Sequence, residues 1–110
     1  MKILNLHNVE LCNEGNEQIS IHVRADIENG ALTISGQDLG SFCETFWGDS
    51  DYEYFYHFSA DETEKLLTAI GGSENPAEAL TERFSGADGC QKLRELCREE
   101  KIRYDFSSYV

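Results

Sequence analysis

The chain has 110 residues, of which 40% are hydrophobic, 11% are aromatic and one is proline. This length fits a single domain over residues 1–110 that can bury its own core, and the aromatic content excludes a disordered chain of similar charge. The formal net charge of −12 repels nucleic acid and anionic membranes and attracts basic proteins or cations. Solubility alone is the alternative use of such a charge.

The first two expected strands pair through a short turn. Residues 2–12 carry apolar side chains in both registers, which indicates either a bulge or a strand covered on both sides, and a polar turn at 13–17 follows. In 19–27 apolar and polar residues alternate, as they do in a strand with one face in the core. His22 and Arg24 are then expected to point away from the core.

The pair Asn29-Gly30 predicts a hairpin turn, because both residues adopt positive φ readily. The alternating residues 31–35 are expected to form the strand after the turn. Asp38 and Ser41 can each cap a short helix that follows, with aromatic side chains four residues apart on a shared side.

The next expected strand, 52–58, lies in an unusual part of the chain. Residues 25–64 contain ten carboxylates and no Lys or Arg, with an aromatic cluster in the second half. Tyrosines alternate along one face of the strand, and Glu53, Phe55 and His57 alternate along the other. Both faces therefore carry rings, and alternation does not decide which one is exposed.

Three helices are expected next, followed by a last strand. Ser59, Asn75 and Asp88 each stand as an N-cap before an apolar stripe at helical spacing, and residues 102–106 then alternate again. Strands grouped early and helices grouped late predict an α+β fold. We expect a mainly antiparallel sheet of four to five strands with the C-terminal helices packed on one face.

A metal site is not expected in this chain. Asp49, Asp51 and Glu53 resemble the start of a calcium-binding loop, but the glycine and the final glutamate that such a loop requires are absent. The acids at 49 and 51 then belong to a turn in which they bond their own backbone.

Enzymatic motifs are also missing, so we expect neither catalysis nor a cofactor. The four cysteines form no CxxC pair, and no nucleophile elbow, P-loop or dinucleotide motif occurs. A catalytic alternative would pair Cys43 with His22 or His57, or use two of the carboxylates as acid and base. The N-terminus has no signal-peptide pattern and no apolar run reaches transmembrane length, so reduced thiols in the cytosol are expected.

The aromatic run suits a partner-binding surface. Phenylalanines such as Phe55 are expected in the core because they have no polar tip, whereas tyrosine and tryptophan combine a large apolar body with a hydrogen-bonding end. Neighbouring acids would receive a basic partner. The predicted partner-binding residues are Glu44, Trp47, Asp49, Asp51, Tyr52, Glu53, Tyr54, Tyr56 and His57.

Segments 34–40 and 46–54 resemble a motif that recurs in small stand-alone bacterial proteins of unassigned function. In size, acidity and compactness the whole chain is similar to immunity proteins that neutralise bacterial toxins. The resemblance implies a cytosolic protein that occludes a basic toxin domain, such as a nuclease, with carboxylates in place of substrate phosphates. The alternative is a small-ligand or cation-binding domain, or a degenerate enzyme, that uses the open sheet face around His22, His57 and Glu53.

Overall fold

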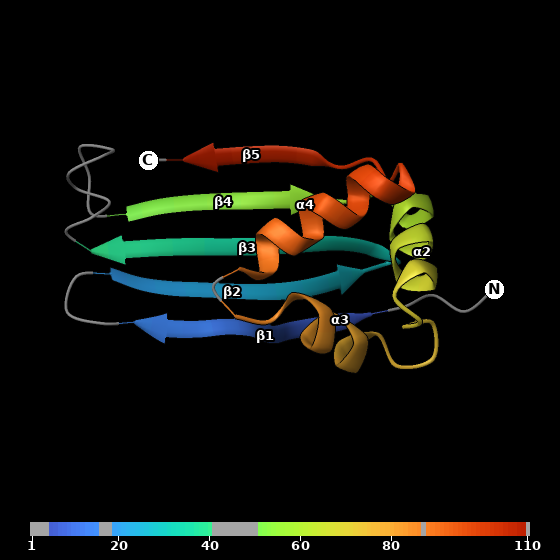
Figure 1. Ribbon diagram of the computed structural model, residues 1–110, viewed down its shortest axis with the longest axis horizontal. Coiled ribbons are helices and arrows are strands. Elements are labelled where there is room, and N and C mark those ends of the chain that lie inside the picture. The colour runs from blue at the N-terminus through green and yellow to red at the C-terminus, as the bar shows by residue number, and fades with distance from the viewer. Residues whose placement is uncertain (1–4, 16–18, 41–50, 87, 110) are drawn as a thin grey trace.

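The computed structural model describes residues 5–15, 19–40, 51–86 and 88–109. They form a five-stranded antiparallel sheet with helices on one face, which is the predicted α+β class (Figure 1). The strands lie in the order β1-β2-β3-β4-β5, so β1 and β5 are the edges. The elements in chain order are β1 (Leu6–Gly15), β2 (Ile19–Glu28), β3 (Ala31–Gly40), β4 (Asp51–His57), α2 (Ala60–Ala69), α3 (Pro76–Phe84), α4 (Gly89–Glu100) and β5 (Asp105–Tyr109).

The β2–β3 hairpin confirms the turn prediction. Asn29 has φ 51° and Gly30 has φ 85°, the positive values that a two-residue turn of this kind requires. The strand on the N-terminal side alternates as expected, with Val23 and Ala25 buried and Arg24 exposed. Local chemistry therefore determines the register of the sheet's centre.

The third strand is longer than predicted. β3 continues to Gly40, and Asp38 lies within it, paired with Ile21 on one side and Tyr52 on the other. The prediction that Asp38 caps a helix is therefore wrong, because its backbone is part of the sheet. The short helix that we expected after Ser41 lies outside the described residues.

The first strand is bulged, as predicted. Its pairing with β2 shifts register between Leu6 and Val9 and again between Glu10 and Cys12. The strand runs to Gly15, so the turn that we predicted at 13–17 begins too early. Residues at the end of the strand are polar because they lie beyond the part of the sheet that the helices cover.

Helices α2 and α3 begin at the predicted caps. The Ser59 side chain accepts a hydrogen bond from the Glu62 backbone N–H at 3.3 Å, and Asn75 accepts one from Glu78 at the same distance. The helical spacing predicts Ala77, Leu80, Thr81 and Phe84 as the inner side of α3. Leu80 and Phe84 are buried together with Ala79, whereas Thr81 is exposed. The helix is thus rotated slightly from its predicted orientation.

The last strand begins later than predicted. After Lys101 ends α4 with φ 56°, the chain enters an extended connection in which Ile102 is 5% exposed and belongs to the core. Pairing with β4 starts only at Asp105. Ile102 is therefore apolar because it packs under the helices rather than because it alternates in a strand.

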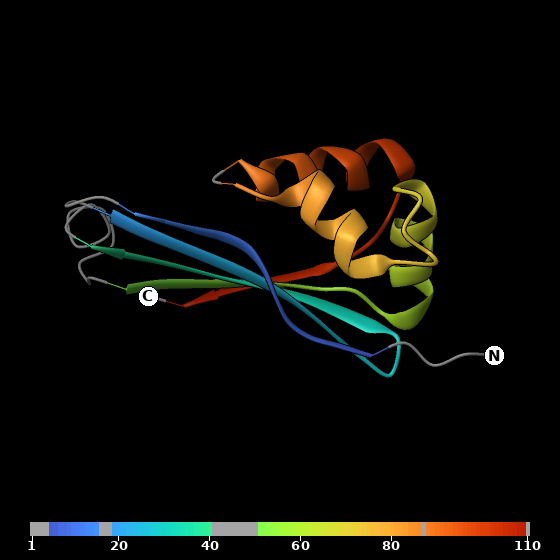
Figure 2. The same cartoon turned by 90° about the horizontal axis from the view of Figure 1, so that it is seen from below.

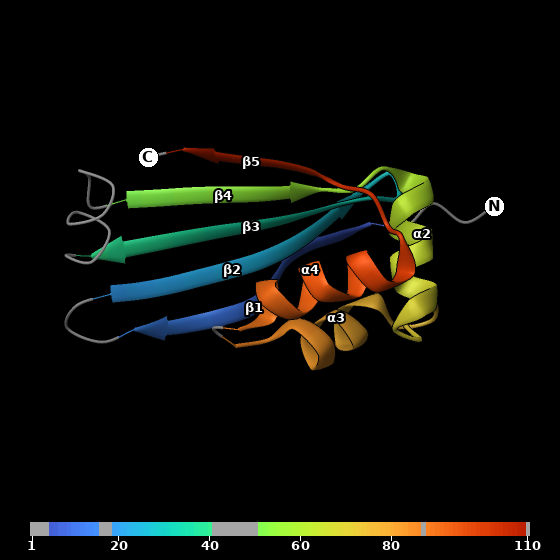
Figure 3. The same cartoon turned by 45° about the horizontal axis from the view of Figure 1, so that its top comes forward.

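The helices cover only part of the sheet. Figure 2 shows α2, α3 and α4 on one side of the strands, and Figure 3 shows them gathered toward one end. Ten-residue strands such as β2 and β3 span roughly 33 Å, whereas the twelve-residue α4 spans roughly 18 Å. The core lies where the two overlap, around side chains that include Ile34, Phe58, Leu66, Leu80 and Leu93.

Candidate functional site

The strand β4 places the predicted site residues on two opposite faces. Tyr54 pairs with Gly36 and Tyr56 pairs with the buried Ile34, so the tyrosines face the helices. Glu53 and His57 lie on the other face, which no described helix covers (Figure 2). Tyrosines and acids that are neighbours in the sequence are therefore separated by the sheet itself.

The remaining predicted residues lie mostly elsewhere. Glu44, Trp47 and Asp49 fall outside the described residues, so their part in a binding surface stays a prediction. Asp51 is the first residue of β4, where its backbone pairs with Leu39.

On the helix face, the Tyr54 ring lies over Gly36 of β3. A side chain at Gly36 would collide with the Tyr54 ring, so the absence of a Cβ at this position is what admits the ring. The Tyr54 hydroxyl donates a hydrogen bond to Asp38 Oδ1 at 3.3 Å. Burial raises the pKa of Tyr54, and burial likewise raises the pKa of Asp38, although the Tyr54 hydrogen bond opposes this second shift.

Tyr56 is a core residue. Its side chain is 2% exposed, and its hydroxyl accepts a hydrogen bond from Arg94 Nη1 at 2.7 Å. Burial raises the pKa of this hydroxyl. The prediction that Tyr56 is an exposed anchor is therefore wrong, because the ring is enclosed between the sheet and α4.

A hollow of about 300 Å³ lies beside these tyrosines, between the sheet and α4. The Tyr52 and Tyr54 ring centroids are 5.6 Å apart within it. It is lined by Asp38, Tyr52, Tyr54, Tyr56, Cys90, Gln91, Arg94 and Phe106.

The opposite side of the sheet, which we term the open face, consists of three cross-strand rows of mainly polar residues. The pairing aligns His22, Gln37, Glu53 and Tyr109 in one row, and Arg24, Ser35, Phe55 and Ser107 in the next. The open face comprises Glu10, His22, Arg24, Asp26, Thr33, Ser35, Gln37, Glu53, Phe55, His57, Asp105, Ser107 and Tyr109.

Aromatic rings gather on the open face along β4 and β5. The Phe55 ring stacks on His57 with centroids 6.0 Å apart and an interplanar angle of 13°, and it meets Tyr109 edge-on at 5.8 Å. Phe55 is only partly buried and Tyr109 is 61% exposed. Our prediction that Phe55 is a core residue is therefore wrong, because its face of the strand is the one without helices.

Sequence reasoning also missed Tyr109. The strand pairing brings it beside Glu53, although the two are distant in the chain. For the exposure of Phe55, in contrast, a signal was present in the sequence. Phe55 shares its face of the strand with Glu53 and His57, and a face that carries ionisable groups is usually the solvated one.

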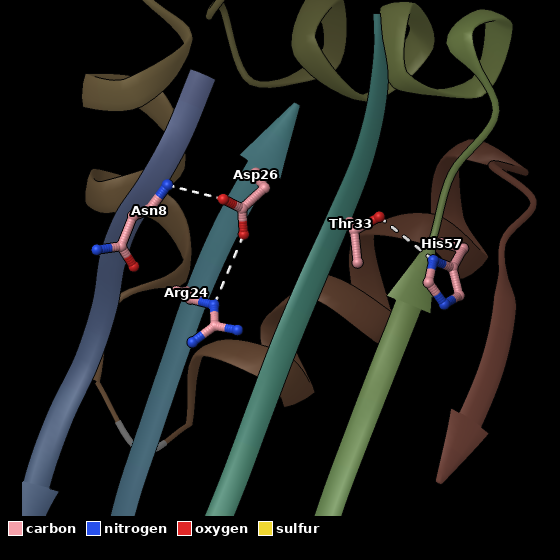
Figure 4. Close-up of polar contacts among 5 residues, drawn as sticks. All are labelled: Asn8, Arg24, Asp26, Thr33 and His57. Carbon is pink, nitrogen blue, oxygen red and sulfur yellow. Dashed lines mark hydrogen bonds and ion pairs between the residues drawn. The ribbon is translucent and has the colours of Figure 1, made fainter. Parts of the chain in front are cut away.

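Polar contacts hold other side chains of the open face, and His57, in place (Figure 4). Arg24 Nε lies 3.7 Å from Asp26 Oδ2, and Asp26 Oδ1 accepts a hydrogen bond from the Asn8 backbone N–H at 2.8 Å. His57 Nδ1 lies 3.2 Å from Thr33 Oγ1. A hollow of about 450 Å³ lies along the same strands, and Glu10, His22, Gln37, Glu53 and Phe55 are among its lining residues.

The charges are distributed unevenly between the sheet and the helices. The described strands carry eight carboxylates and one base, Arg24, which is already paired with Asp26. The described helices carry eight carboxylates and five bases. The excess negative charge thus belongs mainly to the sheet.

The candidate cation ligands on the open face do not lie close together. His22 and Glu53 flank Gln37 in one row, but His57 lies four residues from Glu53 along β4, roughly 13 Å away. Within the described ranges, no three His, Cys, Asp or Glu side chains are grouped closely enough to hold a metal ion. The three residues of the cation-binding alternative therefore do not form one cluster.

The described cysteines are free thiols. Cys12 and Cys97 are buried and Cys90 is partly buried. Burial raises the pKa of Cys90 to about 11 and that of Cys97 to about 11, so both thiols are protonated at neutral pH. Cys43, the cysteine of the catalytic alternative, lies outside the described residues.

Comparisons with protein-family models, with curated proteins and with solved structures found no match to this chain. Across the described part of the chain, every helix is too short or too polar to cross a bilayer.

Proposed function

We propose that this protein is an immunity-type inhibitor that binds a basic toxin domain, such as a nuclease, with the open face of its sheet. The observation that supports this most is an uncovered sheet face with acids around an aromatic centre. Glu53 and Asp105 flank the cluster of Phe55, His57 and Tyr109 on this face. Aromatic anchors within a charged rim are typical of protein interfaces.

The charge distribution favours the approach of a basic partner from the sheet side of the molecule. A sheet with eight carboxylates and one base attracts a basic partner toward its own side of the molecule, and such steering raises association rates by roughly 10- to 1000-fold. The carboxylates would then occupy positions that substrate phosphates take in a nuclease. Once bound, Phe55 and Tyr109 lose their contact with water, which slows dissociation.

The cytosol is the compartment that we propose for this activity. The described cysteines are all free, and free buried thiols are typical of a reducing environment. An inhibitor that protects its own cell from a nuclease has to act where the nucleic acid is.

The test combines genetics with matched charge reversals. We expect co-expression with the basic toxin domain encoded by a neighbouring gene to rescue growth. Glu53→Lys with Asp105→Lys should abolish that rescue, slow association at least tenfold and flatten its salt dependence. The control is Glu82→Lys with Glu99→Lys, which makes the same charge change on exposed helix residues.

Two results would refute the proposal. One is a basic neighbouring toxin domain that neither binds the protein nor is inhibited by it. The other is equal loss of rescue in both charge-reversed variants, since net charge rather than the open face would then explain binding.

The hollow on the open face favours one second candidate, a small-ligand site. Its volume of about 450 Å³ lies in the range of small-molecule pockets, and His22, Arg24 and Glu53 provide polar groups in it. A calcium titration tests whether this site binds a cation, because an ion that binds the folded protein raises Tm as the ion concentration increases. An unchanged Tm at millimolar calcium would exclude it.

A further inference from the structure

The two edges of the sheet differ in how well they can accept another strand. The outer edge of β1 is irregular, with two register shifts and with Asn8 at φ 54°. Bulges of this kind bend an edge away from a straight partner and protect it from pairing. The pairing of β5 with β4 runs without a shift from Asp105 to Tyr109, so its outer edge is regular.

Within the described residues, strand β5 also carries the exposed large apolar side chains. Phe106 is 51% exposed and Tyr109 is 61% exposed, and no other large hydrophobic side chain in the described residues is classed as exposed. The strand has neither Lys nor Pro, the residues with which proteins commonly protect an edge. Among the described residues, no strand pairs with its outer side.

The side chains of β5 specify what would fit beside them. Its pairing with β4 places Asp105, Ser107 and Tyr109 on the open face, and Phe106 and Ser108 on the helix face. An added strand would direct alternate residues to these two faces. Basic residues would lie beside Asp105, and apolar residues would cover Phe106.

We propose that β5 receives an extended segment of the basic partner as a sixth strand of the sheet, with basic and apolar residues alternating along that segment. This inference rests on the proposed function and specifies how the partner binds. Main-chain hydrogen bonds would supply affinity, and the alternation would supply specificity. A second copy of the chain is a poorer occupant, because each copy carries a net charge of −12.

The probe is a capped hexapeptide of alternating lysine and valine, added to the full chain and followed by amide hydrogen exchange. At a peptide concentration roughly tenfold above Kd, the outward amides of β5 should exchange roughly tenfold more slowly, because only the free fraction exchanges. The amides of β1 provide an internal control and should not change. The same peptide with every backbone nitrogen methylated keeps the charge, loses the donors and should give no protection.

A variant tests the apolar contact. Phe106→Ser removes an anchor from a position that is 51% exposed, so the fold should persist, as urea denaturation can verify. We expect Kd for the peptide to rise roughly tenfold, as it does when an interface anchor is truncated. An unchanged Kd would show that Phe106 is not part of the site.

The other outcomes are also decisive. If the peptide changes the NMR chemical shifts of Glu53 and Phe55 while the amide exchange rates of β5 stay the same, strand addition is overturned and binding to the open face remains intact. Protection of β5 that grows with protein concentration in the absence of peptide would identify a second copy as the occupant and overturn the proposal. Absence of any peptide binding would also overturn it, whereas the toxin test above would be unaffected.

Discussion

The contact between Gly36 and Tyr54 predicts a strong coupling between two residues that are neighbours only across the sheet. A Cβ at Gly36 would overlap the edge of the Tyr54 ring and lie 2.6 Å from its hydroxyl oxygen. Gly36 does not have a positive φ, so alanine is compatible with the backbone, and the nearest obstacle to its Cβ is the Tyr54 ring. Gly36→Ala must therefore displace Tyr54 from its place across β3.

The expected cost follows from these contacts. Overpacking of this kind costs about 1–3 kcal/mol, and losing the hydrogen bond from Tyr54 to Asp38 adds about 1 kcal/mol. The lower backbone entropy of alanine in the unfolded chain offsets about 0.5–1 kcal/mol. We expect the free energy of unfolding to fall by about 1–3 kcal/mol, which lowers Tm by roughly 5–15 °C in a domain of this size.

A double-mutant cycle isolates the cause. Urea denaturation would be measured for Gly36→Ala, Tyr54→Ala and the double variant. In the Tyr54→Ala background the alanine at position 36 should be neutral or stabilising, because the ring with which it collides has gone. Equal destabilisation by Gly36→Ala in both backgrounds would refute the reasoning, since the cost would then come from the backbone.

Three further predictions concern stability. Thr63→Val should lower the free energy of unfolding by about 1–3 kcal/mol in urea denaturation, because the buried Leu32 N–H would lose the Thr63 Oγ1 acceptor at 2.9 Å, whereas Thr63→Ser should keep most of it. Gly30→Ala should cost about 1–2 kcal/mol in the same assay because Gly30 has φ 85°. Burial raises the pKa of Asp38, so its ionisation costs stability as pH rises through the folded pKa. Asp38→Asn should accordingly be the more stable protein in denaturation at pH 7, and an advantage that persists below about pH 3, where Asp38 is protonated in both states, would contradict this cause.

The sequence predicted the parts of the fold that depend on local chemistry. The Asn29-Gly30 turn, the alternation in β2 and the caps at Ser59 and Asn75 each involve residues within a few positions of one another. The length of β3 was missed because a glycine and an aspartate in its second half resemble the end of a strand. Gly36 is in fact compatible with the strand because a ring from β4 occupies the space of its missing side chain.

The orientation of β4 could not be predicted for a related reason. Period-two alternation separates the two faces of a strand, but it does not say which face meets the helices when both carry rings. The neighbouring strand decides it, since the pairing of Tyr56 with the buried Ile34 places the tyrosines inside. That pairing depends on how β3 and β4 align, which no local pattern in 52–58 contains.

Acids and tyrosines alternate along β4, so substitutions on its two faces test different things. Residues adjacent in a strand lie on opposite faces, so the aromatic neighbour of Glu53 in space is Tyr109 rather than Tyr54. Substituting Tyr54 perturbs the packing against Gly36 and Asp38, and any loss of binding would then follow from a loss of fold. Substituting Tyr109, which is 61% exposed, leaves the core intact and changes only the surface. Loss of binding at unchanged stability in Tyr109→Ala is therefore the signature of the open face.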